Sequence, residues 1–170
     1  MSEVVPMADS YIIPLADGDA PNISGFLPAS GKINKKVNIS VLASDNVKVS
    51  KIILYLKAAG GDFEIDGEKY FEVGSSIYGS GNFGTVEFDT QKSEYGIVDG
   101  EVRLLAVAVD SENNEGRAST AYIVDNTAPS APNVSATAVE LGISLKMDGF
   151  GLPQDFSHFN IYREIGRAHV

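Results

Sequence analysis

The chain has 170 residues and a net charge of −10, with 44% hydrophobic and 21% charged residues. An acidic chain lacks the basic faces that nucleic acids and anionic membranes require, and no apolar run approaches the roughly 20 residues of a membrane span. The absence of cysteine excludes disulfides, thiol chemistry and cysteine-ligated zinc. Seventeen glycines without a long helical pattern predict an all-β fold with many turns.

Two similar linkers divide the chain. Residues 1–15 are interpreted as the end of a preceding domain, followed by a linker at 16–21. About one domain length later a strand, a linker and a repeat of the Ala-Pro-Asn start recur, which places a domain at 22–126 and a second linker at 127–132. Proline at both joints stiffens the connection, as suits domains arranged in a row.

Alternation of apolar and polar residues predicts strands at residues 22–26, 37–43 and 49–58. The expected inward positions of the second and third strands are Val37, Ile39, Val41, Ala43, Ile52, Leu54 and Leu56. Residues 60–84 are rich in aromatic residues and glycine, and Asp66-Gly67 signals a hairpin. This segment is interpreted as an inserted ribbon, after which residues 85–89 resume a regular strand with Val86 and Phe88 inward.

Residues 99–110 form the expected central strand, which enters a polar hairpin loop at 111–116. Its inward side chains are Val102, Leu104, Ala106 and Ala108, and its outward ones include Leu105, Val107 and Val109. If this strand pairs with residues 49–58, Ile53 and Tyr55 adjoin the outward set. An apolar outer face of this size requires a cover, which the inserted ribbon can supply.

The segment Ala43-Ser44-Asp45-Asn46, the Asp99-Gly100 turn, the strand 102–109 and the loop 110–116 resemble those of bacterial immunoglobulin-like domains. The resemblance covers residues 19–126 and implies a seven-stranded sandwich of the kind found in tandem in secreted and cell-surface proteins. The cysteine pair and core tryptophan of antibody-type domains are missing, so that subgroup is excluded.

Residues 130–134, 143–147 and 155–163 resemble the first three strands of a fibronectin type III domain, with Met147 where that family usually has tryptophan. The expected fold is therefore all-β: an immunoglobulin-like β-sandwich with an inserted β-hairpin, plus a truncated fibronectin type III-like segment at 133–163. A half sandwich of this kind leaves its inner face uncovered. Residues 164–170 resemble the translation of a sequencing adaptor and are interpreted as a non-native tail.

Catalysis is not expected. The two histidines, His158 and His169, have no evident nucleophile or metal partner in the sequence. The serines lie in turns and linkers without a nucleophile-elbow pattern.

A calcium site is the first candidate for a specific role. In an immunoglobulin-like topology the first linker and the loops after the second and sixth strands lie at one pole. Their carboxylates could supply the hard oxygen ligands of Ca²⁺. The candidate ligands are Asp17, Asp19, Asp45, Asp110 and Glu112, with Asn46 and Asn113 beside them. In the alternative interpretation these residues cap strands and form turns.

A ring-lined binding surface is the second candidate, because sugars stack on aromatic faces. The rings are Tyr55, Phe63, Tyr70, Phe71 and Tyr78, with Phe83 close by in sequence. In the alternative interpretation they are buried and cover the outer apolar patch.

The expected function is a non-catalytic structural spacer or presentation module of a multidomain extracellular bacterial protein, with an adhesive role as one form. The alternative is a carbohydrate- or ligand-binding accessory module of an extracellular enzyme. The expected partners are neighbouring domains of the same chain and a cell-surface protein or glycan. The resemblance implies an extracellular or cell-surface bacterial protein, and the composition is compatible with that setting.

Overall fold

The computed structural model describes residues 16–78, 82–148, 158 and 160–162. The chain divides into two compact units, Met1–Asn126 and Thr127–Val170, which are described separately. Strands dominate both units, and a short 3-10 turn, η1 (Ser93–Tyr95), interrupts the first. No helix among the described residues is long and apolar enough to cross a membrane.

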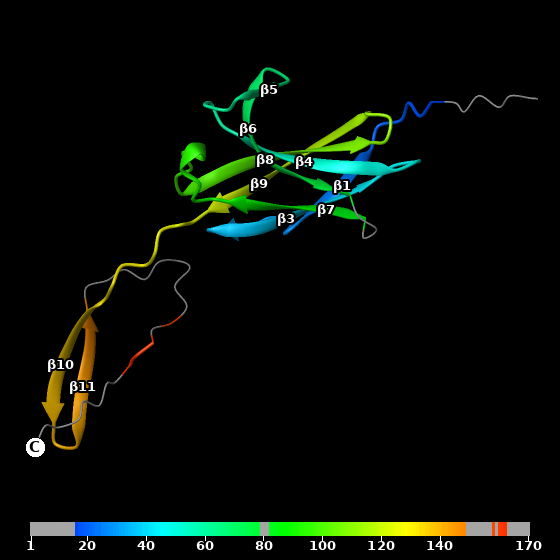
Figure 1. Cartoon of the computed structure of the whole chain (residues 1–170). Coiled ribbons are helices and arrows are strands. Elements are labelled where there is room, and N and C mark those ends of the chain that lie inside the picture. The colour runs from blue at the N-terminus through cyan, green and yellow to red at the C-terminus, as the bar shows by residue number, and fades with distance from the viewer. Residues whose placement is uncertain (1–15, 79–81, 149–157, 159, 163–170) are drawn as a thin grey trace, which may run out of the picture. The chain divides into compact units, whose positions relative to one another are not determined.

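The first unit is a sandwich of two sheets, and these form the layers visible in Figure 1. The smaller sheet has the order β1-β3-β7, with β1 at Asn22–Leu27, β3 at Lys36–Ser44 and β7 at Phe83–Asp89. The larger sheet has the order β2-β9-β8-β4-β6-β5. Its strands are β2 (Lys32–Ile33), β9 (Glu115–Val124), β8 (Gly100–Asp110), β4 (Val49–Lys57), β6 (Glu68–Ile77) and β5 (Phe63–Ile65). This confirms the predicted fold class.

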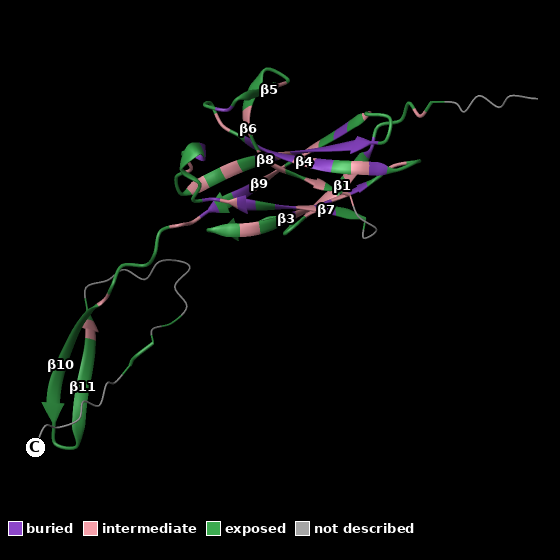
Figure 2. Cartoon of the chain, in the orientation of Figure 1, coloured by how far each residue is buried: buried purple, intermediate pink, exposed green. Residues whose placement is uncertain are grey.

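The main core lies between the two sheets, where alternate residues of each strand point inward. The predicted inward residues of β4 are buried, as are Leu104, Ala106 and Ala108 of β8, and Figure 2 shows the buried stretches of both strands. Val102, the fourth predicted inward residue of β8, is only partly buried and packs against this core. The strand β3 contributes Ile39, Val41 and Ala43, and β7 contributes Val86 and Phe88. Period-two alternation therefore identified the residues of this core, because successive side chains of a strand point to opposite faces of the sheet.

A second apolar cluster covers the outer face of the larger sheet. Tyr55, Val107 and Val109 are buried there. Cross-strand pairing joins Ile53 to Val107 and Tyr55 to Leu105, as the sequence predicted. The residues packed against the buried three are Ile53, Ile65, Tyr70 and Leu105. Since Ile65 and Tyr70 belong to β5 and β6, the inserted hairpin supplies the predicted cover.

The inserted segment also extends the main sheet, which the sequence did not indicate. The strand β6 pairs antiparallel with β4 from Tyr70 opposite Lys57 to Ile77 opposite Lys51. One irregularity interrupts this ladder between Leu54 and Tyr55. Phe71 of β6 consequently packs against the main core and not over the outer cluster.

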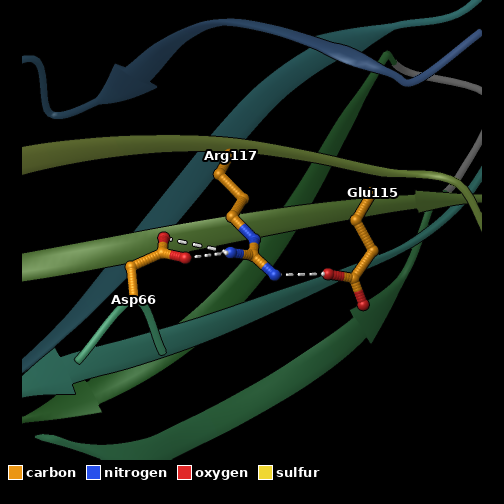
Figure 3. Close-up of polar contacts among 3 residues, drawn as sticks. All are labelled: Asp66, Glu115 and Arg117. Carbon is orange, nitrogen blue, oxygen red and sulfur yellow. Dashed lines mark hydrogen bonds and ion pairs between the residues drawn. The ribbon is translucent and has the colours of Figure 1, made fainter. Parts of the chain in front are cut away.

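Arg117 on β9 ties the tip of the β5–β6 hairpin to the sheet (Figure 3). Its Nη1 atom donates to both carboxylate oxygens of Asp66, at 3.2 and 3.1 Å, and its Nη2 atom donates to Glu115 Oε2 at 2.9 Å. Asp66 and Gly67 have φ values of 53° and 79°, the left-handed conformations of a tight two-residue hairpin turn. The turn is thus fixed both by its own backbone and by β9.

We expect Arg117→Met to lower the free energy of unfolding by less than about 1 kcal/mol, because ion pairs between exposed side chains contribute little. Tyr55→Ala should cost about 3 kcal/mol, because it opens a cavity beneath the same hairpin. Urea unfolding of the full chain measures both changes. A larger loss for Arg117→Met than for Tyr55→Ala would mean that the ion pairs, and not the apolar cluster, hold the hairpin.

The second unit contains one described antiparallel pair, β10 (Asn133–Val139) and β11 (Gly142–Asp148). Figure 2 shows that this pair is almost entirely exposed. One face is wholly apolar, since the register pairs Val134 with Met147, Ala136 with Leu145 and Ala138 with Ile143. The predicted strand at 155–163 lies largely outside the described residues, as do the predicted segments 1–15 and 164–170.

Candidate functional site

Three loops meet at the end of the first unit where the chain enters it, and we call this region the acidic pole. The linker before β1 contributes Asp17, the β3–β4 loop contributes Asp45, and the end of β8 contributes Asp110. One carboxylate oxygen from each of these aspartates lies within 4.8 Å of the others. Three residues that are far apart in the sequence therefore form one cluster.

Asp110 is the most deeply placed member, with 2% of its surface exposed. Its Oδ1 atom accepts hydrogen bonds from the backbone N–H groups of Glu112 and Asn114, both at 2.8 Å, and its Oδ2 atom accepts one from Asn114 Nδ2 at 2.7 Å. Burial alone would raise the pKa of Asp110, but the hydrogen bonds from the Asn114 side chain and the loop backbone outweigh it and lower the pKa. The carboxylate is therefore ionised at neutral pH.

Asp45 shapes the β3–β4 loop with one of its oxygens. Its Oδ2 atom accepts hydrogen bonds from the backbone N–H groups of Val47 and Lys48, at 2.9 and 3.0 Å. Its Oδ1 atom is buried and has no hydrogen-bond partner. The turn-capping role expected for Asp45 therefore uses one of its two carboxylate oxygens.

Asp17 places the linker against the domain. Its backbone carbonyl accepts from Asn114 Nδ2 at 3.0 Å, and its Oδ1 atom accepts from Asn46 Nδ2 at 3.0 Å and from the backbone N–H of Asp19 at 3.1 Å. Its Oδ2 atom, like Asp45 Oδ1, is buried without a partner. The linker is thus part of the folded unit from residue 17 onward.

The remaining predicted ligands lie at the edge of this cluster. Asp19 is exposed and joins it through Asn46, whose Nδ2 atom lies 3.2 Å from Asp19 Oδ2. Glu112 is exposed, and its carboxylate is not part of the group of three. The residue that sequence reasoning missed is Asn114, which holds both Asp110 and the linker; its one signal was its place in a polar hairpin loop.

The predicted aromatic residues do not form a single row. Phe63 and Tyr70 pack edge-on against Tyr55 on the outer face, with ring centroids 5.7 and 6.4 Å from the Tyr55 ring. Phe71 and Tyr78 instead pack against the main core, and the Tyr78 hydroxyl bonds to the backbone of Ala43. Phe63 is 44% exposed, whereas Tyr55 is 9% exposed.

A cleft of ≈ 640 Å³ borders the acidic pole on the side of the β3–β4 loop. Asp45, Val47 and Lys48 line it together with Tyr78 and Asn82. Elsewhere, His158 is exposed, and His169 lies outside the described residues.

Comparison with known proteins assigns no family to this chain. No family model matches it, and no curated protein matches it significantly. The functional proposals therefore depend on the geometry of its own residues and on the resemblance described above.

Proposed function

We propose that the first unit is a non-catalytic structural spacer or presentation module in a multidomain extracellular bacterial protein. The observation that carries this proposal is that the described chain is fastened to the body of the unit both at residue 17, before the first strand, and at residue 126, after the last. At the entry, Asp17 is hydrogen bonded to Asn46 and Asn114. A module with fixed entry and exit points transmits orientation to its neighbours, which is what a spacer does.

The exit is fastened through Asn126, the last residue of the unit. Its Oδ1 atom accepts hydrogen bonds from Lys35 N and Thr90 Oγ1, each at 3.0 Å, and its own backbone N–H donates to Asp99 Oδ1 at 2.7 Å. Thr90 is 1% exposed, so this anchor reaches into the protein interior. The chain is therefore fastened to the body of the first unit as far as its last residue, Asn126.

Single-molecule pulling on the full chain, with handles at its two ends, tests the spacer role. We expect one discrete unfolding event that releases about 350 Å of contour length, from the extended length of residues 22–126. Extension without a discrete event would contradict the proposal, because the module would then not keep its length under load.

The alternative role, binding of a carbohydrate or other ligand, is supported by one observation: Phe63 remains 44% exposed within the ring cluster of Tyr55 and Tyr70. A panel of soluble polysaccharides tests it by affinity electrophoresis. Retardation that Phe63→Ala abolishes and Phe83→Ala preserves would favour binding over the spacer role. Phe83 is the matched control because it is 47% exposed and belongs to β7.

A further inference from the structure

The acidic pole concentrates negative charge. Asp17, Asp45 and Asp110 place three carboxylate oxygens within 4.8 Å of one another. Among the described residues, no lysine or arginine forms an ion pair with any of the three. Like charges at this separation repel one another, and most strongly where water is excluded.

Unused hydrogen-bonding capacity at the same place is a second and independent observation. Asp17 Oδ2 and Asp45 Oδ1 are buried and have no partner. In the described part of the chain, every other buried side-chain oxygen or nitrogen atom has a hydrogen-bond partner. Buried polar atoms are almost always paired in native proteins, so two unpaired carboxylate oxygens in one cluster point to a missing partner.

We propose that the acidic pole binds one Ca²⁺ ion through Asp17, Asp45 and Asp110, and that the ion locks the linker onto the domain. Ca²⁺ takes oxygen ligands at about 2.3–2.6 Å, so ligands on opposite sides of it are about 4.6–5.2 Å apart. Three oxygens that all lie within 4.8 Å of one another can therefore contact one Ca²⁺ ion together. Mg²⁺ takes ligands at about 2.0–2.1 Å, demands near-ideal octahedral geometry and dehydrates reluctantly, so a site built from protein carboxylates suits Ca²⁺ better.

The ion would hold the linker to the domain because its ligands come from both. Asp45 and Asp110 belong to the body of the domain, whereas Asp17 belongs to the linker. An ion shared among them therefore joins the linker to two loops at once. Calcium binding stands on these residues alone, so it can hold or fail independently of the spacer role.

The second linker provides an internal comparison. The Ala-Pro-Asn motif that begins at Ala20 recurs 111 positions later at Ala131, and the same offset aligns the two linkers without a gap. It places Ala128 opposite Asp17 and Ser130 opposite Asp19. Because the second linker lacks both carboxylates, the inference specifies one ion per chain, at the first joint.

The test is a titration of the full chain, freed of metal by a chelator, with CaCl₂ in a calorimeter and in thermal unfolding. We expect one Ca²⁺ per chain and, at about 100 times Kd, a rise in Tm of about 10 °C. MgCl₂ at the same concentration should raise Tm by less than half as much. No binding heat and no shift at 10 mM CaCl₂, or an equal response to MgCl₂, would overturn the proposal.

Asp45→Asn and Asp17→Asn remove a ligand charge and keep an oxygen for the existing turn bonds. Each should weaken calcium binding at least tenfold. Asp89→Asn is the matched control, because Asp89 also caps a turn, through Gln91 N at 2.9 Å, and the net charge changes equally. Asp89→Asn should bind calcium as tightly as the unmodified chain does. If Asp89→Asn and Asp45→Asn weakened calcium binding equally, the loss of net negative charge would explain both effects, and the proposed site would be overturned.

Stability without metal separates ligation from turn capping. In chelator, Asp45→Asn should be at least as stable as the unmodified chain, because it relieves repulsion within the cluster. A fall in its Tm in chelator, together with no calcium response of the unmodified chain, would assign Asp45 to the turn alone and overturn the proposal.

Discussion

Phe88→Ala should lower the free energy of unfolding by about 4 kcal/mol, a large part of the total stability of a domain of this size. Phe88 has no exposed surface, and its ring centroid lies 6.2 Å from that of Tyr95. Tyr95 in turn contacts Phe71 of β6, at 5.6 Å. Removing the Phe88 ring therefore leaves a cavity where the smaller sheet, η1 and β6 meet. Urea unfolding of the full chain measures the loss.

The control is Phe83→Ala on the same strand. Phe83 is 47% exposed, so its truncation removes little buried area and should cost less than about 1 kcal/mol. The comparison keeps strand, residue type and substitution constant and varies burial. Similar losses for both variants would mean that strand propensity, and not packing of the core, determines the contribution of β7.

The core could be predicted from sequence because its strands obey one simple period. In β8, Leu104, Ala106 and Ala108 are buried under the smaller sheet, and Val107 lies under the hairpin on the other face. Alternation fixes which residues share a face, and the apolar outer residues required a cover. Both deductions use local information, and the structure confirms both.

Long-range pairing was not predictable in the same way. The second half of β6 reads Gly74-Ser75-Ser76-Ile77, which has the composition of a loop, yet it is a strand because β4 offers it a partner. The two residues of β2 form a strand because they lie parallel to the end of β9. Such pairings are decided by tertiary contacts that override local propensity.

At the acidic pole, prediction from the sequence is limited by the several roles that one residue type can have. Aspartate and asparagine occur in loops as turn formers, as ligands or as both, and the residue type is the same in each case. Topology brought Asp17, Asp45 and Asp110 together as predicted from the sequence. What the sequence could not show is that Asp45 caps its turn with one oxygen and leaves the other buried without a partner.

The linker at this pole also depends on a residue without a side chain. A Cβ atom at Gly116 of β9 would lie 1.7 Å from the carbonyl oxygen of Pro21 and 2.7 Å from its carbonyl carbon. No rotamer relieves this overlap, because both atoms belong to the backbone. Gly116→Ala must therefore displace either the linker or β9, and we expect a loss of about 3 kcal/mol in urea unfolding of the full chain.

Gly25→Ala is the control, because Gly25 lies in β1 with open space around the position of an added Cβ atom. It should leave the free energy of unfolding within about 0.5 kcal/mol of the original value. If Gly116→Ala retained full stability, the close approach of Pro21 to β9 would not exist in solution.

Because Pro21 lies four residues after Asp17, displacement of the linker also moves Asp17 away from Asp45 and Asp110. Gly116→Ala should therefore weaken calcium binding as well, although it alters no ligand, and that joint loss would connect the packing of the linker to the chemistry of the pole.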